Sequence, residues 1–289
     1  MNFEKKTSER EDSMYIEKEV EKYNYAQVPT EADEEEDVVF KITDAEGNII
    51  AGCILEIDRW KIADLDILFV KEEYRRQGMG SALIHQAERA ARERGCRVMT
   101  LGTFDFQARP LYEKHGFTLC GTVKDWPLGH ENYSFIKRLD RPCAEYIPSR
   151  TGVYDIKPGD EDDAEVIGDA LGEYNDAQTQ LPDEYTKMNR KFVDADGKLV
   201  AAIMAGVDGW NTGYVYALWV EEPYRNKGLG SELLRGFESE AKKKGAHMVL
   251  VFNVFDWQAG FFGKCGYTAV STFEDCPKGH HVSEMTKLL

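Results

Sequence analysis

Short apolar segments alternate with polar turns along the chain, and their spacing separates predicted helices from predicted strands. Apolar residues recur at the spacing of one helix face in 13–24 and again in 83–91, which predicts two helices. A short third helix is expected over 107–115, because Gly116 is a typical helix stop. The apolar runs between the turns predict strands at 38–43, 49–57, 65–70, 97–103, 117–123 and 132–139.

The second half of the chain shows the same order of elements. In each half the order is β-α-β-β-β-α-β-α-β-β, which predicts an α/β fold with a mixed sheet (α+β) and helices on its faces. The strands of the second half are predicted near 153–156, 191–193, 199–207, 214–220, 248–253, 267–273 and 282–288.

The similarity between the halves extends to individual residues at an offset of 150. The segment RRQGMG at 75–80 recurs as RNKGLG at 225–230, and the turn at 125–130 recurs at 275–280. A period as long as a whole domain is typical of a duplication and not of a solenoid.

The length of 289 residues agrees with two domains. We expect the first to span 1–142 and the second 150–289, joined by the short polar stretch 141–152. Duplicated domains commonly keep the twofold contact of an ancestral dimer, so an intramolecular pseudo-dimer is expected.

Charge excludes several kinds of partner. With 36 Lys and Arg against 52 Asp and Glu, the net charge is −16, which disfavours nucleic acid and polybasic contact with membranes. No apolar run approaches the roughly 18 residues of a spanning helix, and the first residues lack the apolar core of a signal peptide. A cytoplasmic location is therefore expected.

The six cysteines are scattered, without a C-x-x-C pair. This pattern predicts reduced thiols and neither a disulfide framework nor a zinc site, so no metal is expected.

The repeated glycine-rich loop is the main candidate for chemistry. Gly78 and Gly80 can adopt backbone angles closed to other residues, so that successive N–H groups converge at a helix N-terminus. Arg75 and Arg76 add positive charge, and the combination is suited to a pyrophosphate. The alternative is an ordinary strand-to-helix turn. A Walker loop and a dinucleotide fingerprint are both absent.

These segments resemble a known family. DILFVKEEYRRQGMGSALIHQAERAARERG, followed by FQARPLYEKHGF, is similar to the acyl-CoA-binding core of the GNAT superfamily of N-acetyltransferases. In the second repeat, ALWVEEPYRNKGLGSELLRGFESEAKKKG and WQAGFFGKCGY resemble the same core, equally well at the loop. The resemblance implies two tandem GNAT-like domains, each a mostly antiparallel twisted sheet with helices on both faces. It also implies an enzyme that transfers an acetyl group from acetyl-CoA to a primary amine by direct attack in a ternary complex.

In the family, the loop amides bind the CoA pyrophosphate and the preceding strand binds the pantetheine arm. The residues implied for binding acetyl-CoA are Leu68, Phe69, Val70, Arg75, Arg76, Gln77, Gly78, Met79, Gly80 and Ser81 in the first repeat, and Leu218, Trp219, Val220, Arg225, Asn226, Lys227, Gly228, Leu229, Gly230 and Ser231 in the second.

The resemblance also implies an acid for the departing CoA thiolate. Tyr112 lies where many members of the family have such a tyrosine, whereas the second repeat has Phe262 there. A core aromatic on an amphipathic helix is the alternative for Tyr112. We expect the first repeat to carry most of the activity.

A general base is needed to take a proton from the amine. Asp66, with Asp64 as its neighbour, is the candidate, and a solvated strand face is the alternative. The second repeat has Tyr214 and Tyr216 at these places.

The acceptor is expected to be a small-molecule or peptide amine. The acidic stretch 31–37 could attract a cationic amine, or it could be a solvated charge run. His130 and His280 could border the acceptor site or belong to surface turns. The competing function is a non-catalytic acyl-CoA-binding sensor or scaffold in one or both repeats.

Overall fold

The computed structural model describes residues 4–7, 10–140, 154–179 and 185–289. Its helices are α1 (Arg10–Gln27), α2 (Met79–Glu93), α3 (Arg109–Lys114), α4 (Glu161–Thr179), α5 (Leu229–Lys243) and α6 (Asp256–Lys264). Its strands are β1 (Glu4–Thr7), β2 (Glu36–Thr43), β3 (Ile49–Ile57), β4 (Ile62–Val70), β5 (Val98–Phe104), β6 (Thr118–Lys124), β7 (Glu131–Arg138), β8 (Lys157–Pro158), β9 (Thr186–Lys187), β10 (Arg190–Val193), β11 (Leu199–Val207), β12 (Thr212–Val220), β13 (Met248–Phe255), β14 (Thr268–Glu274) and β15 (His281–Leu288).

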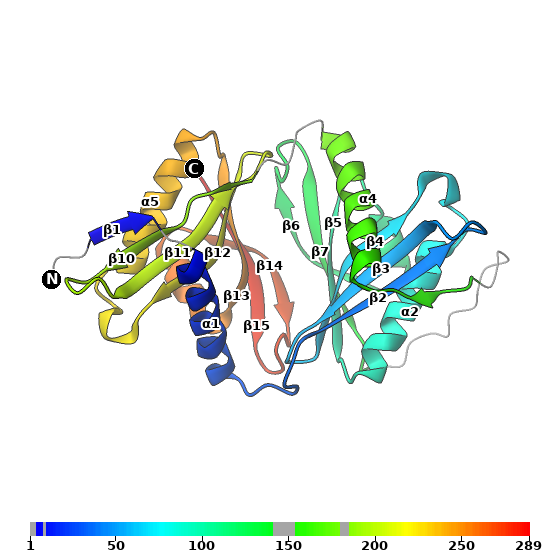
Figure 1. Ribbon diagram of the computed structural model, residues 1–289, viewed down its shortest axis with the longest axis horizontal. Helices are drawn as coiled ribbons and strands as arrows, with labels where there is room; N and C mark the ends of the chain where they lie inside the picture. The colour runs from blue at the N-terminus through cyan, green and yellow to red at the C-terminus, as the bar shows by residue number, and fades with distance from the viewer. Residues whose placement is uncertain (1–3, 8–9, 141–153, 180–184) are drawn as a thin grey trace.

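The strands form two lobes that share one sheet (Figure 1). The first lobe contains β2 to β8, and the second contains β1 and β9 to β15. Within each lobe the pairs are antiparallel except for β4 with β5 and β12 with β13, which are parallel. The predicted mixed, mostly antiparallel sheet with helices on its faces is confirmed.

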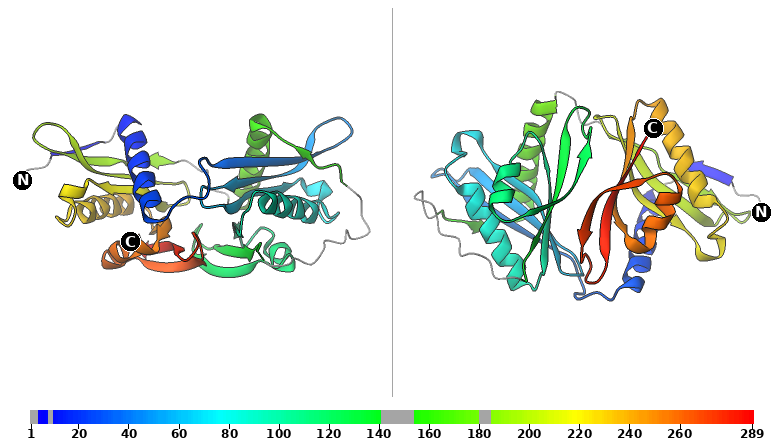
Figure 2. Two further views of the ribbon diagram at one scale, coloured as in Figure 1. Left: turned by 90° about the horizontal axis from the view of Figure 1, so that it is seen from below. Right: turned by 180° about the vertical axis from the view of Figure 1, so that it is seen from behind.

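Alternation along the strands explains why both faces of each lobe carry a helix. In β3, Cys53 and Leu55 belong to the core that contains the apolar face of α2, whereas Ile54 on the other side packs with Ile167 of α4. The left panel of Figure 2 shows α1 and α4 on one face of the sheet and α2 and α5 on the other.

The helix that opens each sequence repeat lies on the lobe of the other repeat. Helix α1 comes from the first repeat, and its Ile16 packs with Ala202, Ala217 and Trp219 in the second lobe. Helix α4 comes from the second repeat and lies on β2, β3 and β4 of the first lobe. A Cβ at Gly52 would clash with the side chain of Ile167, so glycine permits the close approach of α4.

The two lobes meet where β6 and β14 pair through Gly121 and Ser271 (Figure 2, right panel). Related contacts recur on both sides of this junction. Trp60 packs edge-on against Phe255 with ring centroids 5.3 Å apart, and Trp210 packs against Phe104 at 5.4 Å. The repeats are thus joined about an approximate twofold axis.

Most predicted elements agree with the structure to within a few residues. The strand predicted at 153–156 is not found over 154–156, and the nearby β8 consists of two residues. The predicted domain boundaries, 1–142 and 150–289, stay a prediction, and the join at 141–152 lies outside the described residues. No helix in the described ranges is both long and apolar enough to cross a membrane.

Candidate active site

Each lobe contains a fork between its two parallel strands. Strands β4 and β5 pair only as far as Asp64 and Thr100, although β4 continues to Val70. Strands β12 and β13 likewise pair as far as Val215 and Val251. Beyond each fork the outer backbone groups of β4 and β12 do not pair with the neighbouring strand, so they are available to a ligand.

The glycine-rich loops lie directly after these forked strands. Gly78 has φ +102° and is the N-cap of α2, and Gly228 has φ +85° and is the N-cap of α5. Arg76 and Asn226 also have positive φ, at 62° and 60°. The first N–H groups of a helix have no partner within it, so each loop presents amides and the positive end of a helix dipole to an anion.

The two loop arginines are fixed by contacts inside the protein. The Arg75 Nε donates to the carbonyl of Val70 at 3.0 Å, and the Arg225 Nε donates to the carbonyl of Val220 at 2.9 Å. Each guanidinium therefore ties its loop back to the end of the forked strand. This role was not foreseen in the sequence, where Arg75 was expected to supply positive charge and both arginines were expected to bind acetyl-CoA.

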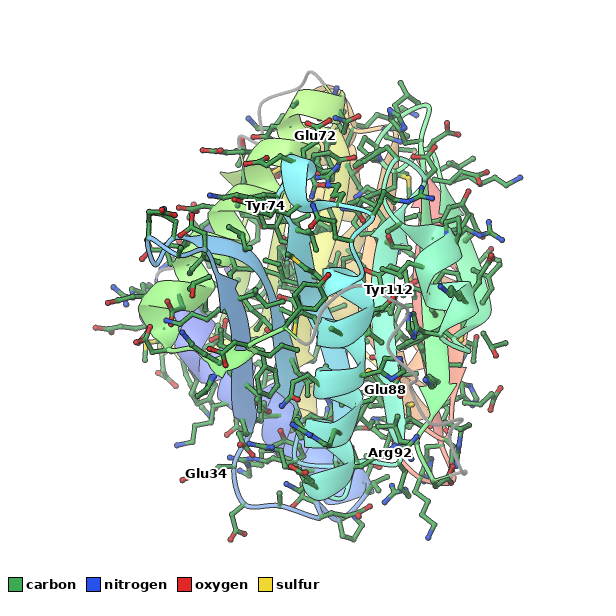
Figure 3. All side chains as sticks on the ribbon, turned by 90° about the vertical axis from the view of Figure 1, so that its right-hand side faces the viewer. Glu34, Glu72, Tyr74, Glu88, Arg92 and Tyr112 are labelled. Atoms are coloured by element: carbon green, nitrogen blue, oxygen red, sulfur yellow. The ribbon has the colours of Figure 1, made fainter. Side chains whose placement is uncertain are left out.

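Tyr112 lies on α3 with its ring buried, 7% exposed, and packs against Phe117 and Phe135. Figure 3 shows it near the N-terminal end of α2, with Glu88 and Arg92 farther along that helix. Burial raises the pKa of Tyr112 well above its usual value, so its hydroxyl stays protonated. No hydrogen bond to that hydroxyl is found within the described chain.

Phe262 occupies the matching position in the second lobe. It packs edge-on against Tyr267 at 5.7 Å, as Tyr112 packs against Phe117 at 6.0 Å. Phe262 lines a cavity together with Ser231 of the glycine-rich loop. The second lobe therefore has no hydroxyl at the position that Tyr112 occupies in the first.

Carboxylates gather at the fork of the first lobe. Asp64 is half-buried on the cavity wall and accepts a hydrogen bond from Thr100 at 2.6 Å. Burial, helped by the charges of Asp66 and Glu56, raises the pKa of Asp64 to about 7. Burial also raises the pKa of Asp66 and of Glu56. These groups titrate closer to neutral pH than exposed carboxyls do.

The second lobe has tyrosines where the first has Asp64 and Asp66. The Tyr214 hydroxyl donates to Asp208 at 2.5 Å and accepts from the indole of Trp126 at 2.7 Å. Burial raises the pKa of Tyr214 above its normal range. Because this hydroxyl is bonded on both sides and keeps its proton, it is a poor base.

One cavity of about 1740 Å³ spans the two lobes, and its lining includes neither Tyr112 nor the first glycine-rich loop. It extends from the first fork and its carboxylates to the second glycine-rich loop. The acidic residues on its wall are Glu35, Asp37, Glu56, Asp58, Asp64 and Asp66 from the first repeat and Glu284 from the second.

The recurring histidines form matched pairs with aspartates. His130 Nδ1 lies 3.0 Å from Asp105, and His280 Nδ1 lies 2.9 Å from Asp256. The described residues contain no group of three or more His, Cys, Asp or Glu side chains able to hold a metal ion.

Comparisons with known proteins agree with this geometry. The model of the acetyltransferase (GNAT) family matches the chain twice, at residues 4–117 and 156–267. A curated relative, blasticidin-S acetyltransferase from Streptomyces morookaense, is 35% identical over 91 residues, which are 31% of this chain and 67% of that protein.

Solved structures of acetyltransferases align with parts of the chain. One from Bacillus cereus has 34% identity and a TM-score of 0.44, and covers 46% of this chain and 95% of its own. Another, from Bacillus subtilis in complex with CoA, has 18% identity and a TM-score of 0.31, and covers 42% and 83%. The double family match shows that the chain belongs, as two tandem copies, to the GNAT family of acyl-CoA-dependent N-acetyltransferases.

Proposed function

We propose that the protein transfers an acetyl group from acetyl-CoA to a small-molecule amine, and that the first lobe carries most of the turnover. One observation supports this above the others. In the first lobe alone, the glycine-rich loop, the forked strand, a buried tyrosine and carboxylates at the fork occur together. In this proposal the loop residues 75–81 and 225–231 hold the pyrophosphate, and residues 68–70 and 218–220 hold the pantetheine arm.

Direct attack of the amine needs a base at the fork. Asp64 suits this role, because its pKa of about 7 lets it accept a proton near neutral pH. Asp66, which the sequence singled out, lines the same cavity and its charge raises the pKa of Asp64. In this proposal Asp64 accepts the proton of the attacking amine, and Asp66 contacts the ammonium group before that transfer.

The remaining steps use backbone and phenol groups. Free N–H groups of β4 beyond the fork stabilise the oxyanion of the tetrahedral intermediate. The Tyr112 hydroxyl then gives its proton to the departing thiolate. The reaction needs no covalent acyl-enzyme, because donor and acceptor are held together.

The acidic wall of the cavity favours a cationic acceptor. Glu35 and Asp37 lie on the wall with the fork carboxylates, so an amine carrying a second positive charge gains further attraction. A small-molecule acceptor is also supported by the relative whose name specifies blasticidin S. The expected cytoplasmic location stays a prediction.

The second lobe supports a different function, binding of acyl-CoA without turnover. Its loop has the same backbone conformation, but Phe262 lacks a hydroxyl and Tyr214 is held by Asp208 and Trp126. This lobe then acts as the sensor or scaffold.

Calorimetry with acetyl-CoA and an assay over a panel of amines test both functions. We expect a stoichiometry near two, and turnover that is faster with diamines and polyamines than with monoamines of equal length. If acetyl-CoA binds but no amine is acetylated, only the sensor function is supported. If acetyl-CoA does not bind, both functions are contradicted.

A further inference from the structure

Helices α1 and α4 each lie on the lobe of the other repeat, and they bring side chains of one repeat to the glycine-rich loop of the other. At the first site, the ring of Tyr174 on α4 lies against the guanidinium of Arg75, with 4.5 Å from Cζ to the ring centroid. Its hydroxyl donates to the carbonyl of Phe106 at 3.0 Å, and the adjacent Asn175 accepts from Gln107 at 2.8 Å.

The second site has related contacts from α1. The ring of Tyr23 lies 4.9 Å from the guanidinium of Arg225. Asn24 accepts from the side-chain amide of Gln258 at 2.9 Å and from the indole of Trp257 at 3.3 Å.

These contacts bridge the two sides of each cleft. On one side, Arg75 is bonded to Val70 at the end of the forked strand. On the other, Gln107 accepts from the backbone N–H of Phe104 at the end of β5, at 2.9 Å. Because α4 contacts both Arg75 and Gln107, it fixes the separation of the strands between which the pantetheine arm inserts.

We propose that Tyr174 and Asn175 are positioning residues for the first acetyl-CoA site, and that Tyr23 and Asn24 are positioning residues for the second. Each site is then completed by the other repeat, and neither repeat forms its site alone. This inference rests on the proposed acetyl-CoA binding and adds to it which side chains hold each cleft open.

Single-site versions of the full chain allow a direct test. Ser81→Glu and Ser231→Glu each place a carboxylate in the first turn of α2 or α5, where it favours the helix but repels a pyrophosphate. In the Ser231→Glu background only the first site remains. There we expect Asn175→Ala and Tyr174→Leu to weaken acetyl-CoA binding about three- to tenfold, as expected for one lost hydrogen bond or cation–π contact.

Conservative and matched variants distinguish a positioning role of Tyr174 from a role in the stability of the fold. Tyr174→Phe keeps the ring on Arg75 and should retain most of the affinity that Tyr174→Leu loses. Glu173→Ala changes an exposed neighbour on the same turn of α4 and should leave binding unchanged. We expect KM for acetyl-CoA to rise while kcat changes little, with melting temperatures alike among the variants.

The reciprocal background, in which only the second site remains, tests which repeat supplies the positioning residues of that site. With Ser81→Glu, Asn24→Ala should weaken the remaining second site, and Asn175→Ala should not. If a Ser→Glu variant fails to fold, hydrogen exchange on the otherwise unmodified chain reports each loop separately: Asn175→Ala should reduce protection by acetyl-CoA at 75–81 and not at 225–231.

If Asn24→Ala weakened the first site, each site would be supported by its own repeat, and this inference would be overturned. Unchanged affinity for acetyl-CoA in all the variants would also overturn it. Either result leaves the proposed function intact. An unmodified protein that binds no acetyl-CoA would instead overturn the proposed function, and this inference with it.

Discussion

Asp64 lies half-buried on the cavity wall, at the point where β4 and β5 separate. Its pKa of about 7 in the folded protein exceeds the ~3.9 of an unfolded aspartate, so ionisation opposes folding. The stability associated with the neutral carboxyl is fully present below about pH 4 and is lost as the pH rises through about 7. Activity has the opposite dependence, because only the ionised form accepts a proton.

We expect Asp64→Asn to become more stable, relative to the unmodified protein, as the pH rises from 4 to 8. The same substitution should lower kcat by roughly 10²–10⁴ and remove the rise of kcat/KM near pH 7. Melting curves and pH–rate profiles check these outcomes. Asp66→Asn is the matched control, and it should move the rise to lower pH because the charge of Asp66 raises the pKa of Asp64. An unchanged profile in Asp64→Asn would show that another group is the base.

Tyr112 and Phe262 differ by one hydroxyl in otherwise matching surroundings. A CoA thiol has a pKa near the ~8.5 of cysteine and leaves readily. We therefore expect Tyr112→Phe to lower kcat on the order of tenfold, less than the usual effect of a general acid. Phe262→Tyr should raise activity measured with the first site closed by Ser81→Glu. If Tyr112→Phe does not change kcat, Tyr112 is a core residue and not the acid.

The glycine-rich loop is an element whose function depends on one backbone conformation. A β-branched residue at φ +102° or +85° is strained, so Gly78→Val and Gly228→Val should each abolish one acetyl-CoA site. Calorimetric stoichiometry should fall from two to one in each variant and to zero in the double variant.

Gly95 provides a control for strain. It has φ +83° at the far end of α2, and a Cβ there would meet nothing within 4 Å, so Gly95→Val introduces similar strain away from the loop. We expect a comparable loss of stability, about 1–2 kcal/mol, without loss of binding. Equal loss of binding in Gly95→Val would mean that the loop variants act through general destabilisation.

At the level of elements, the sequence predicted the helices, strands and loops but not their partners. The apolar stripe of 13–24 shows which face of α1 is buried, yet both lobes offer an equivalent sheet surface, so the stripe does not choose between them. A signal for the bridging residues was present, because Tyr23-Asn24 and Tyr174-Asn175 recur in the pattern Y-N-x-A-Q. The polar strand β1 gave no periodic signal, since it is defined by pairing with β10.

The candidate site was predictable to the extent that it depends on local sequence. Gly78 and Gly228 have the expected positive φ at helix N-termini, because this conformation is a local requirement for glycine, whereas Gly80 and Gly230 lie inside α2 and α5 without a positive φ. The environment of Asp64 was not predictable, because the strands packed around it come from separate parts of the chain. Asp66 is exposed, as the solvated-face alternative expects, and a catalytic role for either aspartate stays a prediction.

At the scale of the whole molecule, the two lobes are joined at a junction where the sequences of the two repeats differ. Positions 150 residues apart face each other there, and in each case a small side chain meets a larger one. Gly121 pairs with Ser271, and a Cβ at Gly121 would clash with the carbonyl of Val270. Ser134 donates to Glu284 at 2.5 Å, and Ser271 donates to the same carboxylate. Two identical repeats could not reproduce this complementarity.

Ser134→Glu tests that complementarity, because it would place a second carboxylate against the buried Glu284. Burial already raises the pKa of Glu284, and two carboxylates so close cannot both ionise. We expect a loss of about 3 kcal/mol in the free energy of unfolding, greater at pH 8 than at pH 5, where the pair can share a proton. Denaturant unfolding at both pH values measures it.

The exchange of both residues provides the decisive comparison. Because the approximate twofold axis relates Ser134 to Glu284, Ser134→Glu combined with Glu284→Ser restores one serine opposite one glutamate. We expect this double variant to regain much of the lost stability, but not all of it, since Gly121 cannot supply the hydroxyl that Ser271 now donates to the carboxylate. A double-mutant cycle should therefore give a coupling of about 1–3 kcal/mol. Additive losses would show that the two positions do not face each other in solution, and that the lobes are joined elsewhere.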